Sequence, residues 1–312
     1  MRLRRNEKVL PPVHPNVGIY SLYRKKLRAL IEEMSRSYEH WMHAAYKANE
    51  PAISQAADSI RRSWAVEQVD VVITKPARPP PGATDFSYVE ETETRKTWLA
   101  MDESPAKELE KELRRLGVQW RKKFETAAPA LAAWFAKSAS RRSDAALRQI
   151  LKDAGISVEF QMTRAMRDIL NATVAGNVAM IRSIPEQYHA QVQDLVMRSV
   201  QTGRDLGTLA KELQARYGVT ERRAALIAFT QNQMATSAMQ RARQTELGID
   251  EAIWLHSHAG KTVRPTHLAN DGKRYKISEG FFDPDPKVRR RIWPGELIRC
   301  RCVAKPIVRG FS

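Results

Sequence analysis

The residue types best suited to chemistry lie near the carboxyl end of the chain. Cys300 and Cys302 are its two cysteines, and with one residue between them their side chains point to the same side of an extended segment. Thiolates and imidazoles are the usual zinc ligands, which makes His267 the best third ligand and His256 or His258 a candidate fourth. The alternative is that these residues only pack or hydrogen-bond, since the spacing matches no standard zinc finger. Zinc is therefore the cofactor to test.

A group of arginines in the same region could bind a polyanion. Its members are Arg289, Arg290, Arg291, Arg299 and Arg301. Guanidinium groups neutralise phosphates, and the nearby Trp293 and Tyr275 could stack on bases. We therefore expect non-specific contact with double-stranded DNA or another polyanion. The alternative is that some of these arginines neutralise the acidic loop around Asp283 and Asp285.

Catalytic motifs give little support for an enzyme. Cys300 beside Arg301, with histidines nearby, could form a nucleophile of lowered pKa. However, the sequence contains no glycine-rich phosphate loop, no nucleophile elbow and no His-Glu-x-x-His motif. Paired carboxylates such as Glu32 and Glu33 are expected on solvated helix faces. We therefore expect no catalytic residues and a chain that is not an enzyme.

Composition and charge favour a basic protein made in a reducing cytoplasm. The 312 residues carry a net charge of +17, of which residues 1–28 contribute +7 and residues 261–312 contribute +8. Charge concentrated at the two ends can meet a polyanion. Two neighbouring cysteines provide no disulfide framework. The most apolar stretch, residues 127–136, is about half a membrane span, so we expect no membrane partner.

Most of the chain shows the apolar periodicity of amphipathic helices. Helices are expected at residues 17–48, from Ser104 to about Pro129, and at 142–153, 160–182, 183–201, 205–218 and 220–248. Ser183 and Glu186 have the spacing of a capping box that would open one helix, and Gly218 would end another. Consecutive prolines at residues 79–81 predict an extended linker at about residues 70–90.

After Gly248 the pattern changes to short strands and turns. Strands are expected at residues 273–277 and 302–308, and Pro306 would place the second of them at a sheet edge. The predicted fold is therefore mainly α, with long amphipathic helices in an extended or bundled body and a small α+β C-terminal module. The predicted divisions are residues 1–100 (basic leader, long helix and Pro-rich linker), 101–182 (a helical region) and 183–312, which joins helices at 183–248 to a mixed module at 249–312.

Residues 205–245 also admit a DNA-binding interpretation. Two helices around Gly218, with Arg222 and Arg223 at the start of the second, resemble a helix-turn-helix. Against this, Ala224 and Ala228 begin a stripe of small residues that suits close helix packing better than reading a DNA groove. A DNA-binding regulator is therefore the alternative function.

Five landmarks follow one another in the second half of the chain. They are Ser183-Ile184-Pro185, Arg223-Ala224-Ala225-Leu226-Ile227-Ala228-Phe229-Thr230, Gly248 with Trp254, the segment Val263-Arg264-Pro265-Thr266-His267 that leads to Gly272, and Pro294-Gly295 before Cys300-Arg301-Cys302. Over about residues 160–308 this order resembles the phage head morphogenesis family typified by the F protein of phage Mu. Many members of that family have Cys-x-x-Cys where this chain has residues 264–267, so four sulfur ligands cannot be assembled here.

The resemblance implies a minor head protein of a tailed bacteriophage or prophage. Such a protein acts in the host cytoplasm during procapsid assembly near the portal and becomes a component of the virion. Its implied partners are the portal, scaffold or major capsid protein, and it could contact DNA non-specifically during packaging or ejection. Trp254, Gly272 and Pro294 are the implied core positions of the C-terminal module.

Overall fold

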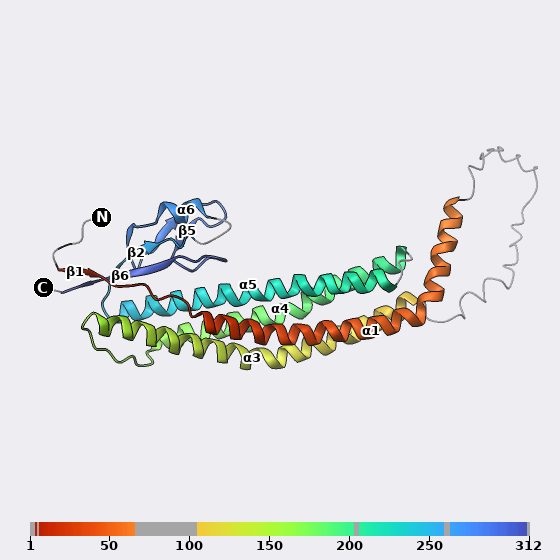
Figure 1. Cartoon of the computed structure of the whole chain (residues 1–312), viewed down its shortest axis with the longest axis horizontal. Coiled ribbons are helices and arrows are strands. Elements are labelled where there is room, and N and C mark those ends of the chain that lie inside the picture. The colour runs from red at the N-terminus through yellow and green to blue at the C-terminus, as the bar shows by residue number, and fades with distance from the viewer. Residues whose placement is uncertain (1–3, 5, 66–104, 203–205, 259–262, 311–312) are drawn as a thin grey trace, which may run out of the picture.

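A computed structural model shows four long helices side by side in an elongated bundle, with a small sheet module at one end (Figure 1). The structure describes residues 4, 6–65, 105–202, 206–258 and 263–310. The bundle helices are α1 (Val17–Ala65), α3 (Pro105–Asp153), α4 (Arg164–Thr202) and α5 (Leu206–Glu246). The mainly α fold with a small mixed C-terminal module is thus confirmed. The division into three domains stays a prediction, and the expected linker at 70–90 lies outside the described residues.

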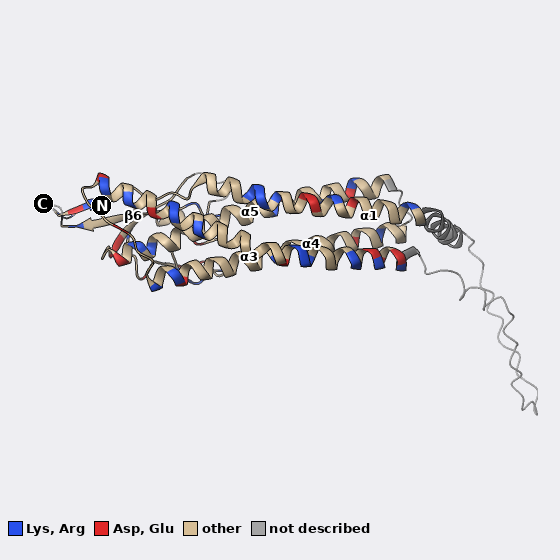
Figure 2. Ribbon diagram, turned by 90° about the horizontal axis from the view of Figure 1, so that it is seen from below, with Lys and Arg blue, Asp and Glu red and all other residues tan. Residues whose placement is uncertain are grey.

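The bundle forms because each helix presents an apolar stripe to the others. On α1 the stripe includes Tyr23, Leu27, Ile31 and Met34, which are fully buried and follow the expected spacing of three and four residues. Basic and acidic residues are interspersed along the helices (Figure 2). In the part of the chain that the structure describes, no helix is long and apolar enough to cross a membrane.

Polar pairs inside the bundle join α1 to α4. The pairs, with their oxygen–oxygen or oxygen–nitrogen distances, are Tyr23 with Asn177 (2.8 Å), Ser35 with Tyr188 (2.9 Å), Tyr38 with His189 (3.0 Å) and Tyr46 with Ser199 (3.4 Å). A buried polar group that loses its partner destabilises the fold. These pairs therefore favour one alignment of the two helices over any that slides them.

Several predicted helix ends are wrong. Ser183 and Pro185 lie inside α4, where the Ser183 hydroxyl donates to the Met180 carbonyl and so forms no capping box. Pro129 lies inside α3, so the helices predicted on either side of it are one. In each case the buried stripe continues through the interruption, and the packing outweighs the local signal.

The predicted helix-turn-helix is also wrong. Residues 206–246 form the single helix α5, which runs through Gly218 without a turn. Leu213 before this glycine and Ala224 after it are both buried in the same bundle core. A continuous apolar face thus extends the helix past a residue that often ends one, and residues 206–246 contain no separate recognition helix.

The C-terminal module consists of two small sheets and one short helix. Strands β1 (Glu7–Val9), β6 (Val303–Arg309), β2 (Glu251–Leu255) and β3 (Arg274–Lys276) form an antiparallel sheet in that order. Strands β4 (Phe281–Asp283) and β5 (Arg290–Ile292) form a hairpin ribbon, and helix α6 spans Pro265–Ala269. The two predicted strands correspond to β3 and β6.

Sequence reasoning missed β1, which brings the amino-terminal segment into this sheet. Because β1 covers one side of β6, Pro306 lies in a central strand and its predicted edge position is wrong. The Pro306 carbonyl still accepts the backbone N–H of Leu10 at 2.9 Å. The sheet thus connects the start of the bundle to the end of the chain.

Candidate metal centre

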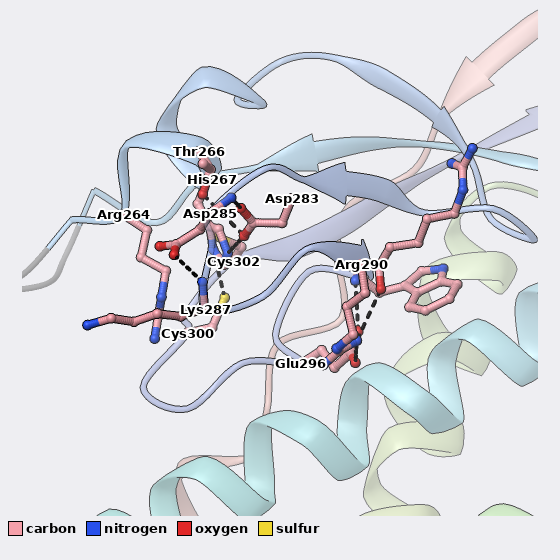
Figure 3. Close-up of polar contacts among 12 residues, drawn as sticks. Arg264, Thr266, His267, Asp283, Asp285, Lys287, Arg290, Glu296, Cys300 and Cys302 are labelled. Atoms are coloured by element: carbon pink, nitrogen blue, oxygen red, sulfur yellow. Dashed lines mark hydrogen bonds and ion pairs between the residues drawn. The ribbon is translucent and has the colours of Figure 1, made fainter.

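Three of the predicted zinc ligands meet inside the C-terminal module. Nδ1 of His267 lies 3.4 Å from Sγ of Cys300 and 3.6 Å from Sγ of Cys302. The three donor atoms lie within 4.8 Å of one another, and all three residues are buried (Figure 3). Two sulfurs and one imidazole nitrogen at this separation match the preferred donor set of zinc.

Different elements position the three donors. His267 lies on α6, which starts with Pro265 at its first position, a residue whose backbone angle suits a helix start. Cys300 lies in a turn in which its N–H binds the Leu297 carbonyl, and Cys302 directly precedes β6. Arg299, which directly precedes Cys300, has a φ of +61°, a left-handed conformation that is unusual for arginine.

The three predicted core positions differ in burial, since Trp254 and Pro294 are buried whereas Gly272 is exposed. Trp254 on β2 is fully buried, and its ring meets the His267 ring edge to face with centroids 5.2 Å apart. Gly272, with a φ of +72°, donates its N–H to the Trp254 carbonyl. The Pro294 carbonyl accepts the hydroxyl of Ser237 on α5 and so ties the module to the bundle.

A buried carboxylate that sequence reasoning missed completes the site. Oδ2 of Asp283 on β4 lies 3.7 Å from Nε2 of His267, and it accepts the Thr266 hydroxyl at 3.2 Å (Figure 3). Its other oxygen accepts the N–H of Asp285. A metal-binding histidine commonly directs its second nitrogen to a carboxylate, and Asp283 lies on that side of the His267 ring. Sequence reasoning had treated it as part of an acidic loop that nearby arginines could neutralise.

The two thiols interact directly, and this changes their acidity in opposite directions. A hydrogen bond from Cys302 lowers the pKa of the Cys300 thiol far below its ordinary value, and His267 lowers it further. The same hydrogen bond, together with burial, raises the pKa of Cys302. One sulfur is therefore ready to bind a metal as a thiolate. Coordination by both sulfurs requires the Cys302 thiol to lose its proton as well, so metal binding would release that proton.

The two candidate fourth ligands differ in position. His256 lines the same small cavity as His267 and the cysteines, and its Nδ1 accepts the N–H of His258. The side chain of His258 is exposed and binds Oδ2 of Asp271 through Nε2 at 2.8 Å. Neither belongs to the group of donors within 4.8 Å. The position of His256 thus makes it the better candidate.

The five predicted polyanion-binding arginines lie in two places. Arg289, Arg290 and Arg291 lie on or next to β5, where Arg290 pairs with Glu296 and Arg291 lies 3.8 Å from Glu279. The other two are Arg299 and Arg301, which line the cavity beside the metal centre. Contact of either group with a polyanion stays a prediction.

Comparisons with known proteins bear on the same region. Residues 190–305 match the family described as Phage Mu protein F like protein, which confirms the resemblance over that segment. A protein of Haemophilus influenzae, described as uncharacterized, is 33% identical over 139 residues, or 45% of this chain and 29% of the relative. The chain thus spans less than a third of that relative. No solved structure matches.

Proposed function

We propose that this chain, whose residues 190–305 match the Phage Mu F-like family, is a minor head protein of a tailed bacteriophage or prophage. It acts in procapsid assembly near the portal and stays in the virion. The observation that carries the proposal is the position of the match, which takes in the end of α4, all of α5 and nearly the whole C-terminal module. The role is structural rather than catalytic.

The architecture suits a protein that bridges other head components. An elongated bundle with charged residues along its exposed faces offers a long contact surface, while the compact module lies at one end (Figures 1 and 2). The proposed partners are the portal, the scaffold or the major capsid protein. Contact with packaged DNA, non-specific in sequence, is a second proposed role for the basic module.

Co-expression tests the assembly role. The chain is produced with the portal and capsid proteins of the same genome, and complexes are isolated through a tag on the chain. We expect the chain to co-purify with one of them and to be present in assembled heads. Heads that form normally without it, together with no association in solution, would contradict the proposal.

DNA contact has its own test. Binding to two unrelated duplexes of equal length should be equally tight and should weaken steeply as salt rises, because phosphate contacts release counterions. A strong preference for one duplex would point to sequence reading. The continuous α5 makes that outcome unexpected, since it provides no recognition helix.

We also propose that His267, Cys300 and Cys302 hold a zinc ion, with His256 as the candidate fourth ligand. The proposal is supported by the buried donor set and by the carboxylate behind the imidazole. Bound zinc would hold α6 against the segment before β6. Elemental analysis of protein purified without chelator should find about one zinc per chain. A zinc content near zero in folded protein would contradict the site.

A further inference from the structure

The surface beside the metal centre combines exposed aliphatic side chains with arginines. We name it the Arg264 face, and its members are Val263, Arg264, Leu268, Ile298, Arg299 and Arg301. Val263, Leu268 and Ile298 are 43%, 45% and 61% exposed. Single exposed apolar residues are common on proteins, but a group of them is typical of an interaction site.

Local contacts bring these residues together. The Arg264 guanidinium donates to the Ile298 carbonyl at 2.9 Å, which joins the segment before α6 to the loop before Cys300. The N–H of Leu268 donates to the Arg264 carbonyl at 3.1 Å, so Leu268 follows one turn after Arg264. The Arg301 guanidinium lies 5.1 Å from the centre of the Phe229 ring on α5. The Arg264 face therefore reaches from α6 to the bundle.

A small cavity opens within the Arg264 face. Val263, Arg264, Arg299 and Arg301 line it together with His256, Ser257 and the three metal-site donors, and Figure 3 shows Arg264 beside Cys300. Its volume of about 30 Å³ accommodates one small polar group. None of the described residues that line it carries a carboxylate, whereas three carry a guanidinium. The buried donors form the inner wall of the cavity, and the arginines, of which Arg299 and Arg301 are exposed, form its outer part. The outer part therefore favours a small anionic group.

We propose that the Arg264 face binds an acidic, amphipathic segment of another protein. An Asp or Glu carboxylate of that segment lies at the cavity, where arginine can bind both of its oxygens. Its apolar side chains cover Val263, Leu268 and Ile298. The net charge of +8 on residues 261–312 complements such a segment.

A protein segment fits this surface better than a nucleic acid does. Proteins contact the nucleic-acid backbone mainly through charged and polar groups, so a duplex would leave the three aliphatic side chains without apolar partners. Arginine and apolar residues together are the composition of protein interfaces. The proposal rests on the proposed function in that the partner would be another head component, but its test needs none of those components.

Selection from a random peptide library tests the proposal. Peptides of about twelve residues, a length within the reach of one interface, are selected on the purified full chain. Recovered sequences should carry Asp or Glu next to large apolar residues. Their affinity is then measured for the wild type, Arg264→Gln and Ile298→Ser. Matched controls on α3 are Arg114→Gln, in an exposed ion pair, and Val118→Ser, which replaces an exposed aliphatic residue.

We expect both variants of the Arg264 face to bind the peptides about tenfold more weakly, a loss of about 1.4 kcal/mol, and both controls to bind as the wild type does. Thermal unfolding of each variant checks its fold. The highly exposed Ile298 keeps the test valid if Arg264→Gln is unstable. The proposal would be overturned if no acidic peptides are selected, or if Arg264→Gln and Ile298→Ser both bind the peptides as tightly as the wild type does.

Two further measurements separate this proposal from others. A duplex of about 20 base pairs that binds the wild type and loses affinity in the same two variants would assign the Arg264 face to nucleic acid and overturn the proposal. Association with head proteins that is unchanged in Arg264→Gln and Ile298→Ser would also overturn it, while leaving the proposed function standing. Peptide binding as expected, without any association with head proteins, would support the Arg264 face and contradict the proposed function.

Discussion

Asp283 and the two cysteines lie on opposite edges of one imidazole ring. Oδ2 of Asp283 is 3.7 Å from Nε2 of His267, while Nδ1 of the same ring is within 3.6 Å of both sulfurs. A carboxylate that accepts a hydrogen bond from the second nitrogen of a ligating histidine orients the ring and makes it a stronger ligand. At 3.7 Å Asp283 faces Nε2 without a hydrogen bond, so the ring would have to move slightly towards it when a metal binds. Asp283 is fully buried, and burying a carboxyl group is unfavourable unless a positive or hydrogen-bonding partner faces it. The Thr266 hydroxyl and the N–H of Asp285 are such partners.

The first prediction is that Asp283→Asn weakens zinc binding by about 10-fold to 100-fold, because the amide is neutral and cannot support the imidazole in the same way. Competition with a chromogenic chelator measures the affinity. Asp194→Asn is the control, since Asp194 lies on α4 in an exposed pair with Arg198 and is not one of the candidate ligands. Equal zinc affinity in Asp283→Asn and the wild type would show that the carboxylate has no role in metal binding.

The second prediction concerns the attachment of β1 to the sheet. Arg274 donates hydrogen bonds to Glu7 and, with the N–H of Arg4, lowers the pKa of the Glu7 carboxyl from 4.5 to about 2. Arg309 lies 3.6 Å from the same carboxylate. A carboxyl whose pKa is lowered by folding stabilises the protein above its unfolded pKa, and this stabilisation is lost as the pH falls towards the folded pKa.

Glu7→Gln should therefore have a lower Tm than the wild type at about pH 6, and the difference should shrink as the pH falls from about 5 to about 2. Thermal unfolding followed by circular dichroism measures both. Glu110→Gln, which disrupts an exposed pair with Arg114, should change the Tm little at any pH. A difference between Glu7→Gln and the wild type that does not depend on pH would contradict the ion pair.

The bundle was predictable in class but not in its helix ends. The apolar stripe of α1 fixes its buried face, and the glycine at 155, with a φ of +86°, follows the end of α3 at Asp153 as expected. Local stop signals at Pro185 and Gly218 were misleading, because burial of neighbouring residues in the bundle outweighs them. Nothing local in Glu7–Val9 identifies its partner strand, since the pairing with Arg309 joins the two ends of the chain.

The donors of the candidate site were predictable because zinc ligands are few in kind. His267, Cys300 and Cys302 stand out by type alone, and the structure places them together. Asp283 was not predictable, because an Asp before a proline has the same local pattern in a solvated loop. Its position follows from the pairing of β4 with β5 and from the contact with Thr266, neither of which has a local sequence signal.

The third prediction compares two helix glycines. A Cβ at Gly117 would lie 2.7 Å from the ring of His189, whose Nδ1 is held by the Tyr38 hydroxyl at 3.0 Å. A Cβ at Gly176 would meet nothing within 4 Å. Alanine favours a helix over glycine by about 1 kcal/mol, but overpacking costs about 1–3 kcal/mol. Gly176→Ala should therefore raise the free energy of unfolding, and Gly117→Ala should lower it.

Urea unfolding of the two variants measures this difference. In a His189→Ser background the ring is gone, so Gly117→Ala should become neutral or stabilising. The same sign of effect for Gly117→Ala in both backgrounds would show that His189 does not restrict this position.

The fourth prediction is that Arg243→Met lowers the free energy of unfolding by about 3 kcal/mol, because it leaves Asp144 and Glu246 without their buried partner. The Arg243 side chain is 2% exposed, and its guanidinium binds both oxygens of Asp144 at 3.0 Å, Glu246 at 2.7 Å and the Gln161 carbonyl at 2.8 Å. These contacts hold the end of α5 against α3 and the segment that precedes α4.

Chemical denaturation measures the loss in free energy of unfolding. Arg114→Met, which removes an exposed ion pair, should lose no more than about 0.5 kcal/mol. Adding Asp144→Asn to Arg243→Met should recover part of the loss, because it removes one of the unpaired charges. An effect of Arg243→Met as small as that of the control would mean that the network does not join these helices.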